Sequence, residues 1–305
     1  MKSFIEGKVS IAIPAYKSNF LKEAINSVLS QTYTNFELII VNDNSPEDLD
    51  NIVLSFKDSR IRYYKNEINL GKNSIVHNWN KCLSYARGEF FVLLCDDDIM
   101  KPEFLRTMIN YTIKYPKCNV FKTRCQIIQD NLNNIIEESP IWKEYENEQE
   151  YIINKLDGLR KHTISEFLYR TKHVKKTQYI PFPVGYYSDD ASILRFCKDK
   201  GIVNTKEVLM IFRKSNIHIT GNKKYNIQKT RAAILYYNWL FNNYKNETTL
   251  FYKKIKDQMN YEFHQYFIDT SNIIKALYIL YLIPKTVFTI KEKIAIFLNR
   301  YCNNI

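Results

Sequence analysis

Two kinds of hydrophobic pattern alternate along the first part of the chain. Residues 9–13 and 36–41 are short runs of β-branched and aliphatic side chains, each followed by turn-forming residues. Between them, apolar residues at positions 20, 21, 24, 25, 28 and 29 have the spacing of a helix with one apolar face. The pattern predicts strand, helix and strand in that order, which is typical of a parallel sheet covered by helices.

This alternation continues to about residue 213. Strands are predicted at residues 61–64, 90–94, 120–128, 164–169 and 208–213, and helices at residues 46–56, 74–86, 102–115 and 190–200. Pro102 is expected at the first helical position, where its missing N–H costs no hydrogen bond. Residues 130–160 lose the periodicity and carry six glutamates, which predicts a mobile or partly helical insertion beside a site.

The composition is that of an ordinary globular chain, with 305 residues of which 45% are hydrophobic and 25% are charged. Its net charge of +12 is uneven, because residues 216–305 carry thirteen Lys or Arg against five Asp or Glu. From about residue 222 the sequence is also aromatic and is predicted to be helical. Two interpretations of its charge stay open: an anionic partner, either a membrane surface or a nucleic acid, or a solvated basic face.

Several common sites are excluded by spacing. The seven glycines are never two residues apart, so no GxGxxG dinucleotide loop exists, and Asn66 stands where a Walker A loop ending at Gly71 would need a glycine. The five histidines lack the spacing of an HExxH zinc motif.

The cellular location is also constrained by sequence. The six cysteines show no CxxC spacing and are expected to be reduced. No run reaches the roughly 18 apolar residues of a membrane span, and residues 1–6 lack the apolar core of a signal peptide. A cytoplasmic location is therefore expected.

Three aspartates follow a predicted buried strand directly. Cys95 and residues 96–98 come after the apolar run 90–94, at the carboxyl end where ligands of open α/β sheets bind. Like charges that are adjacent and buried raise one another's pKa unless a cation compensates, and Mg²⁺ or Mn²⁺ prefers such oxygen ligands. The alternative is a surface acidic turn at the start of the next helix.

The first two predicted strands end in polar residues at the same sheet edge. The sequence Ile13-Pro14-Ala15-Tyr16 follows the first strand, and Asp43 lies just after the second. A tyrosine ring there can stack on a nucleobase, and an aspartate can accept the imide N–H of a pyrimidine. The alternative for Asp43 is an ordinary turn and helix cap.

Taken together, these motifs resemble the inverting family-2 glycosyltransferases of the GT-A fold. The matching segments, in order, are residues 9–16 (VSIAIPAY), 24–33 (AINSVLSQTY), 36–45 (FELIIVNDNS), 69–71 (NLG), Asn80, 86–89 (ARGE) and 95–98 (CDDD) with Pro102. The resemblance is strong over about 115 residues and weak to about 221. It implies an α/β fold with a mixed, mainly parallel sheet flanked by helices.

The resemblance implies a nucleotide-diphosphate sugar donor. Tyr16 would then stack on the base and Asp43 would recognise it, with Pro14, Ala15 and Asn80 also in the nucleotide site. Two basic side chains, Lys72 and Arg213, are candidate phosphate contacts.

The aspartates match the DXD region of that family. Asp97 and Asp98 are the expected ligands of Mn²⁺ or Mg²⁺, and Asp96 is expected to contact the ribose or the diphosphate. Cys95 replaces the first aspartate of the common pattern. His218, in a segment that resembles a loop closing over the diphosphate, is a candidate metal contact.

On the acceptor side, the resemblance assigns the catalytic base to Asp190. The sequence Tyr187-Ser-Asp-Asp190 stands where the family carries an acidic pair at the start of a helix. A carboxylate there can remove the proton of a sugar hydroxyl. The alternative is the negative charge that is common in the first turn of a helix.

Three regions are expected on this basis. A nucleotide-binding half over about 1–115 and an acceptor-side half over 116–221 form the catalytic unit, and residues 222–305 form a helical extension. A UDP-hexose or UDP-N-acetylhexosamine donor and an acceptor in surface polysaccharide or lipid-linked oligosaccharide synthesis are expected. The extension would contact an anionic membrane from the cytoplasmic side, or would pack as a subdomain.

Two other classes of function were weighed. A nucleotidyltransferase also holds a metal with carboxylates at a sheet edge, but residues 13–17 lack its glycine-rich and basic phosphate loop. A non-catalytic module that binds an anionic surface or a nucleic acid would use the basic extension alone. Within the glycosyltransferase interpretation, no nucleic acid partner is expected.

Overall fold

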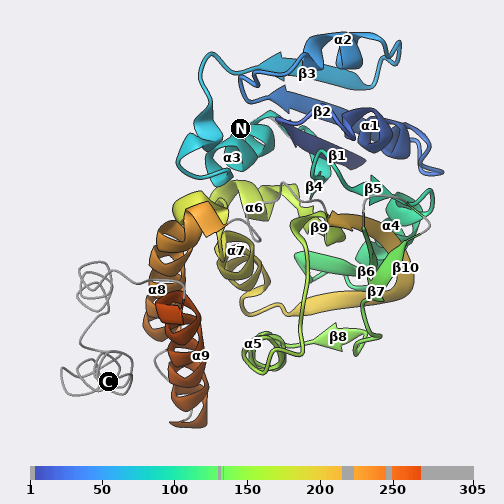
Figure 1. The fold of residues 1–305 in the computed structure, drawn as a ribbon. Helices are drawn as coiled ribbons and strands as arrows, with labels where there is room; N and C mark the ends of the chain where they lie inside the picture. Colours follow the sequence, from blue (N-terminus) through green and yellow to red (C-terminus); the bar gives the residue numbers. More distant parts are fainter. Residues whose placement is uncertain (1–3, 130–131, 133, 215–222, 245–248, 269–305) are drawn as a thin grey trace.

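The computed structural model describes residues 4–129, 132, 134–214, 223–244 and 249–268. One ten-stranded mixed sheet runs through the molecule, with helices on both faces (Figure 1). Its strands are β1 (Ile5–Ala15), β2 (Phe36–Asn42), β3 (Ile61–Lys65), β4 (Gly88–Leu93), β5 (Ile99–Met100), β6 (Val120–Gln129), β7 (Ile135–Glu138), β8 (Tyr145–Glu146), β9 (Phe167–Arg170) and β10 (Ile202–Lys214). Its main path has the order β3-β2-β1-β4-β9-β6-β10-β5.

The α-helices within the described residues are α1 (Leu21–Leu29), α2 (Leu49–Leu54), α3 (Val76–Tyr85), α4 (Phe104–Lys114), α5 (Glu148–Leu156), α6 (Thr171–Thr177), α7 (Ser188–Cys197), α8 (Asn226–Asn243) and α9 (Thr249–Ile268). Single 3-10 turns occur at η1 (Leu70–Lys72), η2 (Ile164–Glu166), η3 (Pro183–Gly185) and η4 (Lys223–Tyr225).

The first four long strands form the parallel half of the sheet. β1 pairs in parallel with both β2 and β4, and β2 pairs in parallel with β3. Ala15 at the end of β1 is in register with Asn42 at the end of β2. The predicted strands and helices of this half are all present, and the strand ends meet at one edge as expected.

Side-chain alternation along these strands creates two cores. In β1, Ile11 and Ile13 pack on the face covered by α1, α2 and α4, whereas Ala12 packs on the opposite face with α3 and α7. All seven residues of β2 are buried. A strand covered on both faces loses the polar half of its pattern, which is why these runs are almost continuously apolar.

The second half is mixed and differs more from the sequence-based expectation. The short β9 pairs antiparallel with both β4 and β6, while β10 runs parallel to β6. Pro102 lies before α4, which begins at Phe104, so its predicted place at the first helical position was wrong. The helix α6 was not predicted, because its seven residues are mostly polar and basic.

The predicted insertion contains regular structure. β7 and β8 add antiparallel edges to the sheet, and α5 begins with a capping box in which Asn147 and Glu150 satisfy each other's backbone N–H groups. This reciprocal pairing explains how a glutamate-rich stretch forms a helix.

The two C-terminal helices α8 and α9 lie side by side at one side of the sheet (Figure 1). The ring of Tyr187, just before α7, stacks on Tyr236 of α8 with centroids 4.6 Å apart. Among the helices of the described residues, none combines the length and apolar character needed to cross a membrane. The boundary at residue 222 stays a prediction, and residues 269–305 of the expected extension lie outside the described residues.

Candidate active site

The loop between β4 and β5 carries the three aspartates at the carboxyl edge of the parallel half. We call Asp96, Asp97 and Asp98 the acidic corner. All three are buried. The turns that follow β1 and β2 lie at the same edge, because parallel strands end there together.

Asp96 holds the turn that follows β1. Its Oδ2 accepts hydrogen bonds from the backbone N–H groups of Tyr16 and Lys17, each at 2.8 Å. Burial raises the pKa of Asp96 to about 6, an effect opposed by Lys17. The Tyr16 ring remains 40% exposed, so a carboxylate fixes the backbone of this turn while its aromatic ring faces outward.

Asp97 faces the ammonium group of Lys17. Lys17 Nζ donates a hydrogen bond to Asp97 Oδ2 and lies 3.7 Å from Asp96 Oδ1. Burial opposes the charged ammonium, but Asp96 and Asp97 outweigh it and raise the pKa of Lys17. A cation was predicted at this corner, but Lys17 was not among the predicted site residues.

Asp98 is the most buried of the three, with 0% exposure. The Ser165 hydroxyl donates to its Oδ2 at 2.5 Å, and the backbone N–H of Arg213 donates to its Oδ1 at 3.2 Å. Burial and the neighbouring Asp97 raise the pKa of Asp98 well above its usual value.

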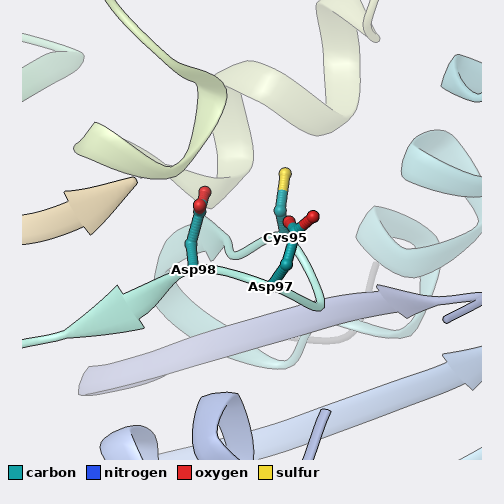
Figure 2. Close-up of side chains that lie close together, drawn as sticks. All are labelled: Cys95, Asp97 and Asp98. Carbon is teal, nitrogen blue, oxygen red and sulfur yellow. The ribbon is translucent and has the colours of Figure 1, made fainter. Parts of the chain in front are cut away.

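The corner meets the distance requirement for one metal ion. Ligand atoms of Cys95, Asp97 and Asp98 all lie within 4.8 Å of one another, and Figure 2 shows Cys95 and Asp98 projecting on the same side of the loop. The two carboxylates suit Mg²⁺ or Mn²⁺. Burial raises the pKa of the Cys95 thiol well above its usual value, so the thiol is a poor ligand for such ions.

Asp43 lies beside the loop that follows β3. Its Oδ1 accepts from the N–H of Leu70 at 2.9 Å and from the Asn66 side-chain amide at 2.7 Å, and its Oδ2 accepts from the N–H of Gly71 at 2.7 Å. A Cβ at Gly71 would come within 2.8 Å of Asp43 Oδ2. The glycine therefore allows the loop to approach the carboxylate.

The other predicted nucleotide residues are spread around this edge. Pro14 and Ala15 are the last two residues of β1, and Lys72 is exposed in η1. The Asn80 amide exchanges two hydrogen bonds with the backbone of Tyr179, at 3.0 and 2.9 Å, and so joins α3 to the segment before α7.

Arg213 is buried beneath the acidic corner. Its Nε donates to the Asp97 carbonyl at 3.3 Å, and its Nη2 donates to Glu23 at 2.7 Å. His218 lies outside the described residues.

Asp189 and Asp190, which we call the aspartate pair, lie in the first turn of α7. Lys155 of α5 places its Nζ 2.5 Å from Asp190 Oδ1. Burial raises the pKa of Asp189 to about 7, and Asp190 adds to the effect. A carboxyl group that titrates near neutrality is suited to proton transfer.

The sequence analysis did not identify His162, which lies against this pair. Its Nε2 is 3.3 Å from Asp190 Oδ1 and 3.9 Å from Asp189 Oδ2. The three residues meet the distance requirement for a metal ion. Lys155 lies against this pair in the same way that Lys17 lies against the acidic corner.

A short segment joins the corner to the pair. Ser165 binds Asp98, and His162, three residues earlier, contacts Asp190. Three residues span at most about 11 Å between Cα atoms. The two carboxylate groups therefore lie at opposite ends of one short connection.

A second connection links the loop before α3 with the loop before α7. The Ser74 hydroxyl donates to the Phe182 carbonyl at 2.7 Å, and the Val184 N–H donates to the Asn73 carbonyl at 3.0 Å. Val184 has φ 51° and Tyr187 has φ 60°, backbone conformations that are unfavourable for these side chains. Such strain clusters where surrounding contacts hold a functional loop.

The chain has a mixed α/β sheet with acidic residues at the carboxyl edge of its strands. Comparison with known protein families shows which family this arrangement belongs to. Residues 10–196 match the model of Glycosyl transferase family 2. This range is more than half of the 305 residues, so the chain belongs to that family.

Two relatives illustrate the similarity. The chain is 40% identical over 103 residues to an uncharacterised glycosyltransferase of Rickettsia typhi, which covers 33% of this chain and 31% of the relative. It is 37% identical over 107 residues to the Escherichia coli UDP-Glc:alpha-D-GlcNAc-diphosphoundecaprenol beta-1,3-glucosyltransferase WfgD, over 35% of this chain and 41% of the relative. The matched part is thus less than half the length of either relative.

Among solved structures, the chain is similar to S. aureus TarS residues 1–349, determined in complex with UDP-GlcNAc. The TM-score is 0.74 at 16% sequence identity, and the match covers 96% of this chain and 89% of that chain. This likeness confirms the predicted GT-A fold.

Proposed function

We propose that this chain is a metal-dependent inverting glycosyltransferase. It transfers a hexose or N-acetylhexosamine from a UDP-linked donor to the hydroxyl of a saccharide acceptor. The observation that carries this proposal is the short 162–165 connection, which holds the acidic corner and the aspartate pair close together. A donor phosphate and an acceptor hydroxyl could thus meet between them.

Each group has a chemical role in this proposal. Tyr16 stacks on the uracil, and Asp190 removes the proton of the acceptor hydroxyl as the glycosidic bond forms. Asp97 and Asp98 would hold Mn²⁺ or Mg²⁺, which supplies positive charge to the departing diphosphate. Attack from the face opposite the diphosphate inverts the anomeric centre.

Lys17 and Arg213 add positive charge beside that corner. Lys17 reaches Asp97 with its ammonium group and is 26% exposed, so it can turn toward a phosphate. Arg213 is buried and supports the Asp97 carbonyl from below. We assign Lys17 to the diphosphate and Arg213 to the shape of the corner.

The donor and acceptor classes rest on likeness. WfgD is named for a UDP-glucose donor and a diphosphoundecaprenol-linked acceptor, and TarS was crystallised with UDP-GlcNAc. We therefore propose a lipid-linked or surface polysaccharide acceptor, and peripheral contact of the basic C-terminal region with an anionic membrane on its cytoplasmic side.

Ligand-dependent stability tests the proposal. UDP with Mn²⁺ is expected to raise the melting temperature more than UDP or Mn²⁺ alone, because a ligand that binds only the folded state stabilises it. The Asp97→Asn variant should lose the part of this increase in melting temperature that depends on Mn²⁺. Hydrolysis of UDP-glucose and UDP-GlcNAc then identifies the donor. Indifference to every nucleotide and metal would favour a non-catalytic binding module.

Membrane contact requires a separate measurement. In a flotation assay, the full chain is expected to float together with vesicles of anionic phospholipid but not with neutral vesicles. Salt should weaken the binding to the anionic vesicles. Equal behaviour with both vesicles would reject peripheral attachment and leave the transferase proposal intact.

A further inference from the structure

His162 connects the aspartate pair to a tyrosine of α5. Its side chain is 0% exposed. The Tyr151 hydroxyl is 2.7 Å from Nδ1 of the ring, and Nε2 is 3.3 Å from Asp190 Oδ1. The helices α5 and α7 that carry these partners pack near each other (Figure 1). The ring therefore spans the gap between Tyr151 and Asp190.

The surroundings of His162 determine its protonation. Burial lowers the pKa of His162 well below its usual value, and the nearby Lys155, Lys122 and Arg160 lower it further. A neutral imidazole carries one N–H. The Tyr151 hydroxyl can donate its hydrogen to Nδ1 only when the hydrogen of the ring is on Nε2. That N–H then points toward the carboxylates of the aspartate pair, whose negative charge favours it.

Two buried polar atoms of this arrangement lack a well-aligned hydrogen-bond partner. Within the described residues, neither His162 Nε2 nor Asp190 Oδ1 makes a hydrogen bond of good geometry, although the two atoms lie 3.3 Å apart. An unsatisfied buried N–H is costly.

We propose that Tyr151 and His162 position the carboxylate of Asp190 for proton transfer. Tyr151 fixes the Nε2–H form of His162, and that N–H orients the carboxylate through Oδ1, which Lys155 also contacts. Oδ2 is then the oxygen that takes the proton. This inference rests on the proposed function, because it gives the base a support.

Rates of donor hydrolysis test the inference, with water as the acceptor. The wild type and variants are assayed with UDP-glucose or UDP-GlcNAc and Mn²⁺. His162→Leu is expected to lower kcat by about 10- to 100-fold, the effect of losing one hydrogen bond to a charged group, with KM nearly unchanged. His162→Gln retains an N–H donor and should restore kcat to within about fivefold of the wild type.

A matched control separates this role from packing. His173 of α6 is another partly buried histidine whose burial lowers its pKa, and it packs on Phe196 away from the aspartate pair. The inference expects His173→Leu to keep kcat. Equal losses in the two leucine variants, or no rescue by His162→Gln, would overturn it.

Coupling and pH dependence provide further readouts. In an Asp190→Asn background, His162→Leu should cause little additional loss of kcat, because residues that act as a unit are not additive. An N–H donor stabilises the ionised carboxylate, so its removal should move the acidic limb of kcat upward by about one pH unit. The charged groups facing this site are Asp189, Asp190, Lys155, Lys122, Arg160 and Glu166.

Nitrogen NMR tests the geometry without enzyme activity. In the full chain labelled with ¹⁵N-histidine, His162 should be neutral and protonated at Nε2 at neutral pH. Tyr151→Phe should change the Nδ1 shift, and Asp190→Asn should change the Nε2 shift. Protonation at Nδ1 would overturn the inference. If the NMR result holds while no donor binds or is hydrolysed, the proposed function fails and the His162 geometry stands.

Discussion

The acidic corner and the aspartate pair contain the same kinds of charged side chain, but different contacts hold the two sets in place. Each joins neighbouring carboxylates to one lysine, Lys17 at the corner and Lys155 at the pair. At the corner, Asp96 and Asp98 accept the backbone N–H groups of Tyr16, Lys17 and Arg213, which lie after β1 or within β10, and Ser165 adds one hydroxyl. At the pair, Asp190 faces the side chains of Lys155 and His162, and the backbone hydrogen bonds that reach Asp189 come from the first turn of α7 itself.

In the proposed function, this difference separates binding from reaction. Backbone donors of a sheet edge are rigid, which suits a place where a metal and diphosphate must fit a fixed geometry. Side chains from α5 and residues 160–162 surround the pair and set how readily it holds a proton. In the proposed function, the corner therefore binds charge and the pair transfers the proton.

Removing the proposed base tests this division most strongly. Asp190→Asn is expected to lower kcat for donor hydrolysis by about 10²- to 10⁴-fold, the usual contribution of a general base. Because the corner is untouched, calorimetry should find the same affinity for UDP with Mn²⁺. Asp199→Asn, at an exposed position after α7, is the control and should keep kcat. A large loss of UDP affinity in Asp190→Asn would show that the pair also takes part in nucleotide binding, against the proposed division of roles.

Asp189 should make stability depend on pH. Burial raises its folded-state pKa to about 7, so the folded state binds this proton more tightly than the unfolded state. Stability from this group is therefore present at low pH and lost as pH rises toward 7. Asp189→Asn should be more stable than the wild type at alkaline pH by on the order of 2–4 kcal/mol.

Urea unfolding at several pH values measures the difference. The gain of Asp189→Asn should shrink as the pH falls below about 6, because the wild-type carboxyl group is then protonated as well. An equal gain at every pH would mean that the carboxylate charge is not its cause.

The corner could be placed from sequence because its parts are local. The aspartates lie in the loop after β4, Tyr16 follows β1 and Asp43 follows β2, and parallel strands bring such ends together. Lys17 was missed for another reason. A lone lysine is usually solvated, and only the structure turns its ammonium group toward Asp97.

The surroundings of the pair could not be predicted in this way. Asp190 was found through the resemblance, whereas Lys155 lies in the stretch without hydrophobic periodicity and His162 lies two residues after it. Capping by Asn147 and antiparallel edge pairing order that stretch. The cap is local, since Asn147 and Glu150 are three residues apart, and it was a usable signal for α5. The edge pairing joins residues distant in sequence, such as Tyr145 and Val203, and periodicity carries no information about it.

Ser165 lies at the corner end of the segment that joins the two regions, and removing its hydroxyl should have a moderate effect. Ser165→Ala removes a donor from the buried Asp98 and an acceptor from the Cys95 N–H. The loss of a hydrogen bond to a buried charged group costs about 2 kcal/mol. Urea unfolding should detect this decrease. Ser84→Ala, whose hydroxyl bonds only within α3 and is exposed, is the control and should change stability little.

The smallest effect concerns Lys17, and its sign distinguishes the two regions. The ammonium group lies against Asp97, which is a proposed metal ligand. Lys17→Met should therefore tighten Mn²⁺ binding in the absence of nucleotide by about tenfold. This factor is a modest share of the interaction energy between two charges near a protein surface. Electron paramagnetic resonance of free Mn²⁺ measures this affinity. Lys22→Met, on the exposed face of α1, should leave it unchanged. Equal tightening by Lys155→Met would show that net charge, rather than the corner, controls metal binding.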